Sequence, residues 1–259
     1  MIENYLNKII EGDALEVMKD IPGNSIDMII TSPPYNVGMP YGTDDRKNYL
    51  DYLDYMKGVL TECYRVLITG GRIAINLPGS ILQSSSSKIA YLSLDYVLIM
   101  RGIGFLDREW ISWLKMPKGE IPEKSTAWGS WQSPSCPYLR DASEFIIIMD
   151  KESHKKPGDK NKIDITVKEF LQFTSNVWYM PPEKNRWHPA PFPEELPYRL
   201  IKLYTYQGDI ILDPFVGWGT TCVVAKRLKR NYIGIDNNPE YCRMATIKIA
   251  NETSLFEKD

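Results

Sequence analysis

The segment 31–36, Thr-Ser-Pro-Pro-Tyr-Asn, carries residue types that suit a planar ligand with an amino group. It follows the apolar run 26–30, which predicts a buried strand, and two consecutive prolines then end that strand in a stiff, extended segment. Because prolines lack N–H groups, the segment offers carbonyl acceptors beside the Ser32 hydroxyl and the flat ring of Tyr35. An amino group could donate to those acceptors while its ring contacts Tyr35. The alternative is a stiff loop with a half-buried tyrosine, and the segment alone leaves both open.

A second segment, residues 210–221, reads Ile-Ile-Leu-Asp-Pro-Phe-Val-Gly-Trp-Gly-Thr-Thr and predicts a strand, a turn and a helix. Gly217 and Gly219 would let the backbone turn tightly and let a ligand approach it closely. The turn has no third glycine at the dinucleotide-binding spacing and no Gly-Lys-Ser/Thr, which excludes a standard dinucleotide fingerprint and a P-loop. About 20 residues later Asp236 ends a further predicted strand, where a carboxylate can accept hydrogen bonds from ribose hydroxyls. An acid at a strand end is common by itself, but its pairing with the glycine turn favours a ligand site.

Asp13 lies between a predicted strand and turn over residues 7–12 and a predicted helix over residues 14–19. An aspartate at that position is a common helix N-cap. The same strand end could also place its carboxylate against a ligand. The sequence leaves the N-cap and the ligand contact open.

Composition limits the class of protein. The chain has 259 residues, of which 43% are hydrophobic and 25% are charged, as in a globular protein with a sizeable core. The formal charge of −2 gives no overall attraction to nucleic acid, so a DNA contact would depend on local basic patches. Four scattered cysteines without a Cys-x-x-Cys pair and only two histidines argue against a zinc site and a disulfide framework. Without a charged-then-apolar leader or an apolar run of about 18 residues, we expect a soluble cytoplasmic protein.

The spacing of apolar residues predicts the further elements that must position these segments. The expected helices cover residues 47–68, 89–102, 167–173 and 194–206, and the first of them is expected to end at the glycine pair 70–71. The expected strands cover residues 72–77, 105–114 and 144–149. The last two are expected to pair, because little else nearby is apolar enough to fill a sheet. Trp110 and Trp113 are expected in the core.

Two polar segments separate these elements. Residues 115–140 are rich in Pro, Gly, Ser and Trp and are too long for an ordinary connection. Their basic residues are interleaved with tryptophans, which suits contact with nucleic acid, and the alternative is a partly ordered surface excursion. Residues 151–162 predict a solvated basic loop, which in a DNA-binding enzyme could contact phosphates.

Taken together, the two candidate segments resemble one protein family. Residues 32–35, Ser-Pro-Pro-Tyr, resemble the catalytic motif of the S-adenosylmethionine-dependent amino-methyltransferases that modify exocyclic nitrogens of DNA bases. The pattern Asp-Pro-Phe-x-Gly-x-Gly-Thr-Thr at residues 213–221 resembles their cofactor motif. His-Pro-x-x-Phe-Pro at residues 188–193 resembles the segment that accompanies that motif. The catalytic motif precedes the cofactor motif, as in the circularly permuted β group of this family.

The resemblance implies a doubly wound, Rossmann-like α/β fold with a mainly parallel, seven-stranded sheet. Residues 1–259 would form a single catalytic domain, with a target-recognition region inserted at approximately residues 115–187. The family implies S-adenosylmethionine as cofactor, double-stranded DNA as partner and no membrane association. Homodimers are common in the family, and its restriction-modification members work beside a cognate restriction endonuclease.

The resemblance also assigns roles to individual residues. The target base would be held by the catalytic residues Ser32, Pro33, Pro34 and Tyr35. The cofactor would be bound by Asp13, Phe192, Asp213, Phe215, Gly217, Gly219, Thr220, Thr221 and Asp236, and no metal is expected. Within this set, the family places Asp236 on the ribose hydroxyls and Asp13 near the adenine.

The expected product is N4-methylcytosine in duplex DNA, formed on a base that is flipped out of the helix. A serine at the first position of the motif is associated in this family with N4-cytosine, and an aspartate with N6-adenine. Cytosine and adenine both present an amino group beside a ring-nitrogen acceptor, so an N6-adenine DNA methyltransferase is the alternative. A methylase of RNA or of protein glutamine, a non-catalytic DNA-recognition subunit and a plain nucleotide-binding module are further hypotheses.

Overall fold

The computed structural model describes residues 1–36, 48–82, 88–115, 129–137, 139, 142–182 and 192–252. The helices in these ranges are α1 (Ala14–Lys19), α2 (Tyr49–Val66), α3 (Leu92–Ile103), α4 (Val167–Phe173), α5 (Glu195–Tyr204), α6 (Thr220–Arg227) and α7 (Pro239–Glu252), with short 3-10 helices at Ile2–Asn4 and Lys160–Lys162. The strands are β1 (Lys8–Glu11), β2 (Ile26–Thr31), β3 (Leu67–Leu77), β4 (Ile81–Leu82), β5 (Ile89–Ala90), β6 (Phe105–Leu114), β7 (Ser143–Lys151), β8 (Val177–Tyr179), β9 (Ile210–Asp213) and β10 (Asn231–Asp236). In this part of the chain, no helix has both the length and the apolar character that crossing a membrane requires.

Eight of the described strands form one sheet in the order β1-β10-β9-β2-β3-β7-β6-β8, and β4 pairs with β5 in a separate sheet. Neighbouring strands are parallel except around β7, which runs antiparallel to both β3 and β6. The α/β class, the mainly parallel sheet and the pairing of β6 with β7 are confirmed, but the expected count of seven strands is wrong. The additional strand, β8, pairs with the end of β6 and is only three residues long. Three residues are too few to give a periodic signal in the sequence.

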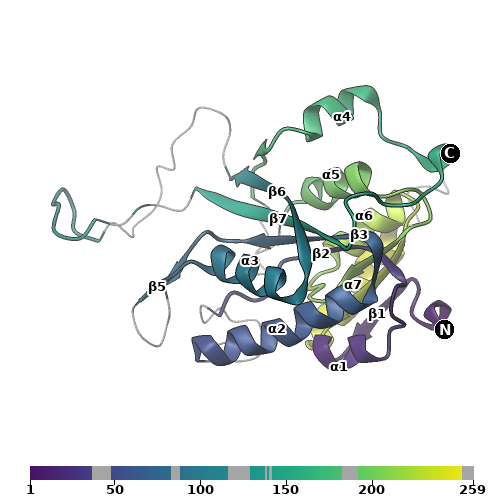
Figure 1. Ribbon diagram of the computed structural model, residues 1–259, viewed down its shortest axis with the longest axis horizontal. Coiled ribbons are helices and arrows are strands. Elements are labelled where there is room, and N and C mark those ends of the chain that lie inside the picture. The colour runs from purple at the N-terminus through teal and green to yellow at the C-terminus, as the bar shows by residue number, and fades with distance from the viewer. Residues whose placement is uncertain are drawn as a thin grey trace.

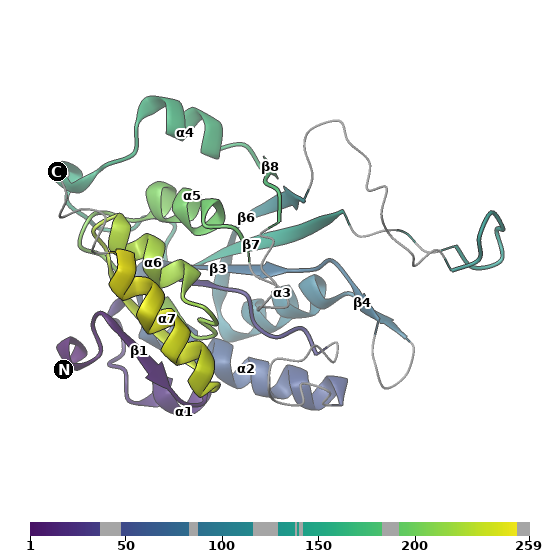
Figure 2. The same ribbon diagram turned by 180° about the vertical axis from the view of Figure 1, so that it is seen from behind.

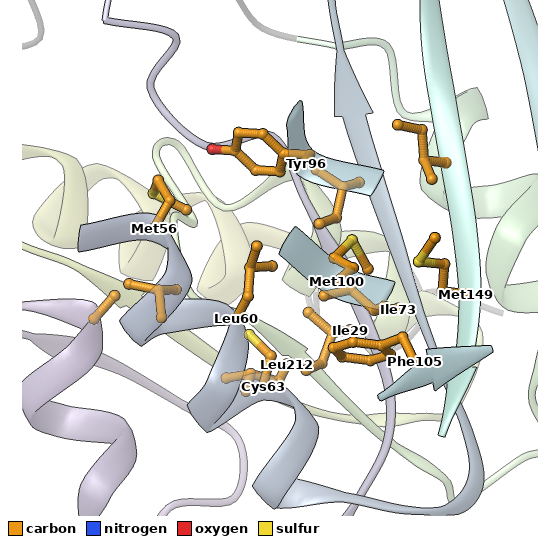
Figure 3. Packing of buried hydrophobic residues seen from close by; sticks show 14 of the residues in the cluster. Ile29, Met56, Leu60, Cys63, Ile73, Tyr96, Met100, Phe105, Met149 and Leu212 are labelled. Atoms are coloured by element: carbon orange, nitrogen blue, oxygen red, sulfur yellow. The ribbon is translucent and has the colours of Figure 1, made fainter. Parts of the chain in front are cut away.

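Helices cover both faces of the sheet (Figure 1 and Figure 2). On one face, α1, α2 and α3 pack around a core that includes Ile29 of β2 and Ile73 of β3 (Figure 3). On the other face, α5, α6 and α7 pack on a core that includes Met28 and Ile30 of β2. Because side chains alternate along a strand, β2 contributes side chains to both cores. Burial of each such side chain stabilises the folded state by about 1.5–3 kcal/mol. This is why the strand is almost continuously apolar.

The glycine pair after α2 has a different role from the expected one. α2 ends at Val66 and β3 begins at the next residue, so the helix does not end at the glycines, which lie inside β3. Gly70 has a φ of +77°, and a Cβ atom there would lie 2.2 Å from the Lys155 carbonyl oxygen. Glycine is therefore required because the chain after β7 passes against this strand.

Two further expectations change in detail. The helix expected over residues 89–102 begins at Leu92, because the residues before it form β5. Trp113 is buried as expected, but Trp110 is 40% exposed and packs edge-on against Phe145. Positions 110 and 113 are three apart on one strand and therefore face opposite sides of the sheet.

Residues 151–162, which begin with the last residue of β7, are not uniformly solvated, contrary to the expectation for them. Lys151 is buried and donates through Nζ to the Leu67 carbonyl at 2.8 Å. The side chain of Lys156 is also buried, and its Nζ lies 2.9 Å from Asp27 and 2.7 Å from Asp209. The acceptors come from distant parts of the chain, which is why the run of charges appears solvated in the sequence.

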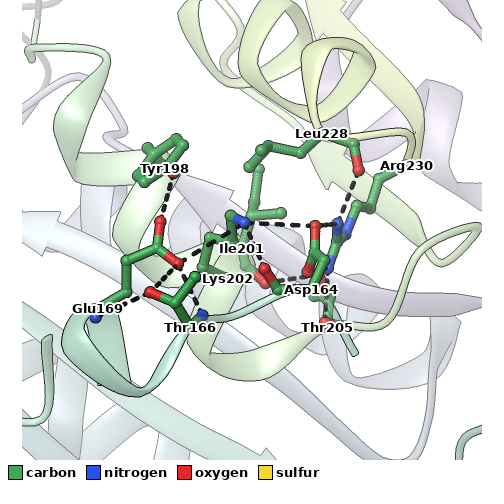
Figure 4. A network of polar contacts seen from close by, with 9 residues as sticks. All are labelled: Asp164, Thr166, Glu169, Tyr198, Ile201, Lys202, Thr205, Leu228 and Arg230. Atoms are coloured by element: carbon green, nitrogen blue, oxygen red, sulfur yellow. Dashed lines mark hydrogen bonds and ion pairs between the residues drawn. The ribbon is translucent and has the colours of Figure 1, made fainter. Parts of the chain in front are cut away.

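The connection from β7 to β8 is anchored by Arg230, which follows α6 (Figure 4). Its buried guanidinium forms a bidentate pair with Asp164, with N–O distances of 2.6 and 2.8 Å. It also donates to the hydroxyl and the carbonyl of Thr205 and to the carbonyl of Leu228. Because these acceptors satisfy the buried charge, the pair holds the connection against the end of α5 without leaving a charge unpaired.

Candidate active site

β2 and β9 lie side by side in the sheet, and the chain leaves them in opposite directions. From β2 it continues to β3 on one side, and from β9 it continues to β10 on the other. An open α/β sheet binds its ligands beyond the carboxyl ends of the strands at such a switch point. Residues 32–35 follow β2 and residues 214–219 follow β9, so the fold brings both predicted segments to this place.

Asp213, at the end of β9, is buried, and its carboxylate accepts three hydrogen bonds from the chain itself. Thr31 Oγ1 donates to Oδ1 at 2.8 Å, and Thr221 Oγ1 donates to Oδ2 at 2.6 Å. The backbone N–H of Phe215 donates to Oδ1 at 3.1 Å. Burial raises the pKa of Asp213 to about 6, although these donors oppose the rise. Asp213 therefore ties β2, β9 and α6 together, and its contact with a cofactor remains a prediction.

The turn after β9 brings its backbone close to neighbouring elements. Gly219 has a φ of +80°, and a Cβ atom there would lie 2.9 Å from the Cβ of Ala245 in α7. Gly217 has a φ of +49°, and its N–H donates to Asp236 Oδ2 at 2.9 Å. Both glycines thus form the tight turn that the sequence predicts, one against a helix and one against a carboxylate at a strand end.

The parallel strands β1 and β10 bring Asp13 and Asp236 to the same edge of the sheet. Asp236 accepts one backbone hydrogen bond on each oxygen, from Gly217 and Asn238, which leaves lone pairs on both oxygens. Burial raises the pKa of Asp236. Asp13 accepts from the first turn of α1 through Oδ1 and from the Tyr55 hydroxyl through Oδ2 at 2.8 Å. The N-cap alternative for Asp13 is confirmed, and its contact with a ligand remains a prediction.

The remaining predicted cofactor residues differ in their surroundings. Phe215 is half-buried and packs against the core beneath α1, α2 and α3. Thr220 is the first residue of α6, and Thr221 is the buried donor described above. Phe192 is half-buried just before α5 and packs against the opposite core. His188 lies outside the described residues.

The hydroxyls of Ser32 and Tyr35 lie 2.7 Å apart at the carboxyl end of β2. Among the described residues, none donates a hydrogen bond to the Pro33 carbonyl. The segment therefore presents a hydroxyl and a carbonyl that can accept hydrogen bonds, as the sequence predicts.

Two tyrosines support the segment from the helical layer. Tyr52 of α2 donates to the Pro34 carbonyl at 2.9 Å, and its hydroxyl lies 2.6 Å from that of Tyr96 in α3. This places Pro34 in an anchoring role. A backbone without N–H donors is thus held through its carbonyl oxygen.

Three polar residues that the sequence did not single out extend the site. Asn76, at the end of β3, and Glu144, at the start of β7, contact the Tyr35 hydroxyl through Nδ2 at 3.1 Å and Oε2 at 3.4 Å. Lys115, directly after β6, forms an ion pair with the other carboxylate oxygen of Glu144. A polar residue near the end of an apolar strand, as at position 76, is a signal that the sequence shows. The sequence shows no signal for the pairing of Lys115 with Glu144, because that pairing depends on the register between β6 and β7.

The sheet has a switch point of the kind at which open α/β proteins bind ligands, and known proteins share this fold. Residues 26–247 match the family model for N6/N4-type DNA methylases. The type II methyltransferase M.HpaI of Haemophilus parainfluenzae is 32% identical over 96% of this chain and 76% of its own length. The DNA adenine methyltransferase YhdJ of Escherichia coli is 30% identical over 93% of this chain and 82% of its own length. The chain belongs to the N6/N4 family of DNA methylases, which confirms the resemblance of the two motifs.

A solved structure has the same fold. The protein TTHA0409 of Thermus thermophilus, complexed with S-adenosyl-L-methionine, superposes with a TM-score of 0.76. The match covers 95% of this chain and 93% of that one, at 28% sequence identity. Nearly all of this chain therefore has the same fold as that protein.

We expect the contribution of Asp213 to stability to depend on pH. Its pKa of about 6 exceeds the usual value of 3.8, so folding takes up a proton between these values and stability rises as pH falls through about 6. Asp213→Asn keeps the shape of the side chain but does not titrate. Between about pH 7.5 and about pH 4.5, the free energy of unfolding of the wild type should rise by about 2 kcal/mol relative to the variant. Urea denaturation measures this difference, and a difference that is constant with pH would contradict the expectation.

Proposed function

We propose that this protein transfers a methyl group from S-adenosylmethionine to the exocyclic N4 of cytosine in duplex DNA. The observation that carries the proposal is the Ser32 hydroxyl, which lies against Tyr35 beyond β2, next to the strand that leads into the glycine turn. Serine is the residue that the family associates with cytosine at this position. Because the relatives include an adenine methyltransferase, N6 of adenine is the alternative acceptor.

The residues at the switch point suit S-adenosylmethionine, which when bound would supply an electrophilic methyl group. Asp236 keeps lone pairs that can accept hydrogen bonds from ribose hydroxyls. Gly217 and Gly219 bring backbone close to the strand ends, and the half-buried ring of Phe215 adds apolar surface. The complex of TTHA0409 with the same compound supports this assignment.

Hydrogen-bond acceptors can activate the amino group of the base. Its lone pair is delocalised into the ring, which makes it a poor nucleophile. If Ser32 Oγ and the Pro33 carbonyl accept hydrogen bonds from the amino group, a pyramidal nitrogen is favoured, with its lone pair available to bond to the methyl carbon. As that N–C bond formed, the bond from the methyl carbon to the sulfonium sulfur would break, and the methylated nitrogen would release one proton to solvent. Positioning and electrostatic preorganisation then supply the catalysis.

A cytosine inside a duplex cannot reach residues 32–35, so the target base must leave the helix. The ring of Tyr35 would stack on the flipped base, while its hydroxyl stays bound to Ser32 and Asn76. Homodimer formation and a cognate restriction endonuclease remain predictions from the family resemblance.

We place target recognition in the connection between β6 and β7. The expected region of residues 115–187 includes β7 and β8, which belong to the main sheet, so the proposal narrows to residues 115–142. Residues 129–137 lie away from the sheet in both views (Figure 1 and Figure 2), and Trp131 among them is 61% exposed. An exposed aromatic ring near basic residues suits contact with nucleic acid.

Mass spectrometry of nucleosides tests the reaction directly. Duplex DNA of mixed sequence is incubated with the protein and S-adenosylmethionine, and N4-methylcytosine is expected. N6-methyladenine would support the class of enzyme but contradict cytosine as the acceptor base. If DNA that contains every short site stays unmethylated while the cofactor binds, a non-catalytic subunit or an RNA or protein-glutamine acceptor becomes the next hypothesis.

The role of Ser32 predicts a kinetic defect. Ser32→Ala should lower the single-turnover rate of methyl transfer by about 100-fold, because the amino group loses an acceptor. The affinity for S-adenosylmethionine should change by less than about twofold, since the hydroxyl does not face the glycine turn in this proposal. Ser175→Ala, at an exposed serine before β8, is the control and should keep the wild-type rate. Full activity of Ser32→Ala with intact cofactor binding would contradict the mechanism.

The proposed recognition segment predicts a binding defect. Trp131→Ala should weaken DNA binding by about tenfold, because the loss of one stacking contact with a base has that magnitude. Fluorescence anisotropy with a labelled duplex measures the affinity. Phe170→Ala removes an aromatic ring of similar exposure from α4 and should have no effect. Equal affinity of Trp131→Ala and the wild type for DNA would contradict the assignment of target recognition to this segment.

A further inference from the structure

Glu144 is the last of a series of polar side chains in contact that begins at Ser32. Ser32 Oγ lies 2.7 Å from the Tyr35 hydroxyl, which lies 3.4 Å from Glu144 Oε2. Asn76 Nδ2 donates to the Tyr35 oxygen at 3.1 Å and also to Glu144 Oε2. Four side chains from β3, β7 and the segment after β2 therefore meet at one edge of the sheet.

The chemistry of these groups determines the direction of the hydrogen bonds. An ionised carboxylate only accepts, so Glu144 requires the amide nitrogen of Asn76, and not its oxygen, on its side. The Tyr35 oxygen then accepts from Asn76, and its own proton can go to Glu144, to the backbone carbonyl of Asn76 at 3.3 Å or to Ser32 Oγ. The ionised carboxylate is favoured among these acceptors, because a hydrogen bond to an ionised acceptor is stronger than one to a neutral acceptor. A Tyr35 proton that points to Glu144 makes Ser32 the donor to Tyr35.

An acceptor role for Ser32 follows from this direction. A serine hydroxyl has one proton and two lone pairs, and a proton that points to Tyr35 leaves the lone pairs for a ligand. The amino group of a base is a donor, so it needs an acceptor here. We propose that Glu144 is a positioning residue that makes Ser32 a hydrogen-bond acceptor for the amino group of the target base. This inference rests on the proposed function and adds to it a residue outside both motifs.

Lys115 holds the Glu144 carboxylate in the orientation that this role requires. Its Nζ pairs with Oε1, so Oε2 faces Tyr35. The side chains of the pair are 31% and 13% exposed, which shields it from the solvent screening that weakens surface pairs. The backbone N–H of Lys115 also donates to the Ala142 carbonyl at 3.0 Å and so closes the β6–β7 connection beside Glu144.

Glu144→Gln tests the proposal, because it keeps the size of the side chain and removes its charge. We expect the single-turnover rate of methyl transfer to DNA to fall by about 10- to 100-fold at about pH 7.5. The affinities for S-adenosylmethionine and DNA should change by less than about twofold. A purely structural role would instead change these affinities together with the rate.

A double-mutant cycle with Tyr35→Phe locates the effect. The Tyr35 hydroxyl links Glu144 to Ser32, so in the Tyr35→Phe background Glu144→Gln should lower the rate by less than about twofold. Glu109→Gln removes an exposed carboxylate from β6 and should leave the wild-type rate unchanged. If Glu144→Gln does not fold, Lys115→Met tests the same series of polar contacts. Its loss of rate should likewise disappear in the Tyr35→Phe background.

The outcomes separate this inference from the proposed function. A Glu144→Gln rate equal to that of the wild type, or an equal loss in the Tyr35→Phe background, would overturn the inference while methyl transfer stands. If Glu144→Gln does not fold, a wild-type rate for Lys115→Met would also overturn the inference. A wild-type protein that transfers no methyl group to DNA would overturn the proposed function itself.

Discussion

The hydrogen bond from Thr31 to Asp213 is the interaction on which both halves of the site depend. β2 and β9 pair over only two residue pairs, the last of which joins Ile29 to Leu212. Beyond this short ladder, the contact of Thr31 Oγ1 with the buried carboxylate holds the strand ends together. One end continues into the proposed catalytic segment, residues 32–35, and the other into the glycine turn. Their relative position is therefore set by side chains where backbone pairing has already stopped.

The opposite ends of the same two strands are held in a similar way. Asp27 of β2 accepts from the backbone N–H of Ile210 at 2.8 Å, and the buried Lys156 pairs with both Asp27 and Asp209. Burial and the nearby Asp27 raise the pKa of Asp209, and Lys156 opposes that rise. Two carboxylates that would be costly to bury alone are compensated by one shared cation. Side chains thus hold β2 and β9 together at both ends of a short ladder, and the site at the carboxyl edge has a rigid base.

The direction of β7 explains which residues join the site from outside the two motifs. β7 runs antiparallel to its neighbours, so its first residues lie at the edge where the parallel strands end. Glu144 therefore lies beside Tyr35, and Lys115 reaches the same edge from the end of β6. The β6–β7 connection begins and returns there as well. Its ends are joined by the hydrogen bond from Lys115 to Ala142, so the proposed recognition segment adjoins the hydroxyls of Ser32 and Tyr35.

Elements with local signals can be predicted from the sequence alone. The apolar run before residues 31–36, the glycine turn after β9 and the helical spacing in α2 all predict correct elements, because each depends on residues close together in the chain. The sequence also places both motifs directly after predicted strands, where open α/β sheets bind their ligands. The folded structure alone shows that β8 belongs to the main sheet, that Lys156 is buried and that Glu144 contacts Tyr35, which lies 109 positions away in the sequence. Those contacts follow from strand order, strand direction and register, which are set by packing between distant segments and leave no periodic pattern in the sequence.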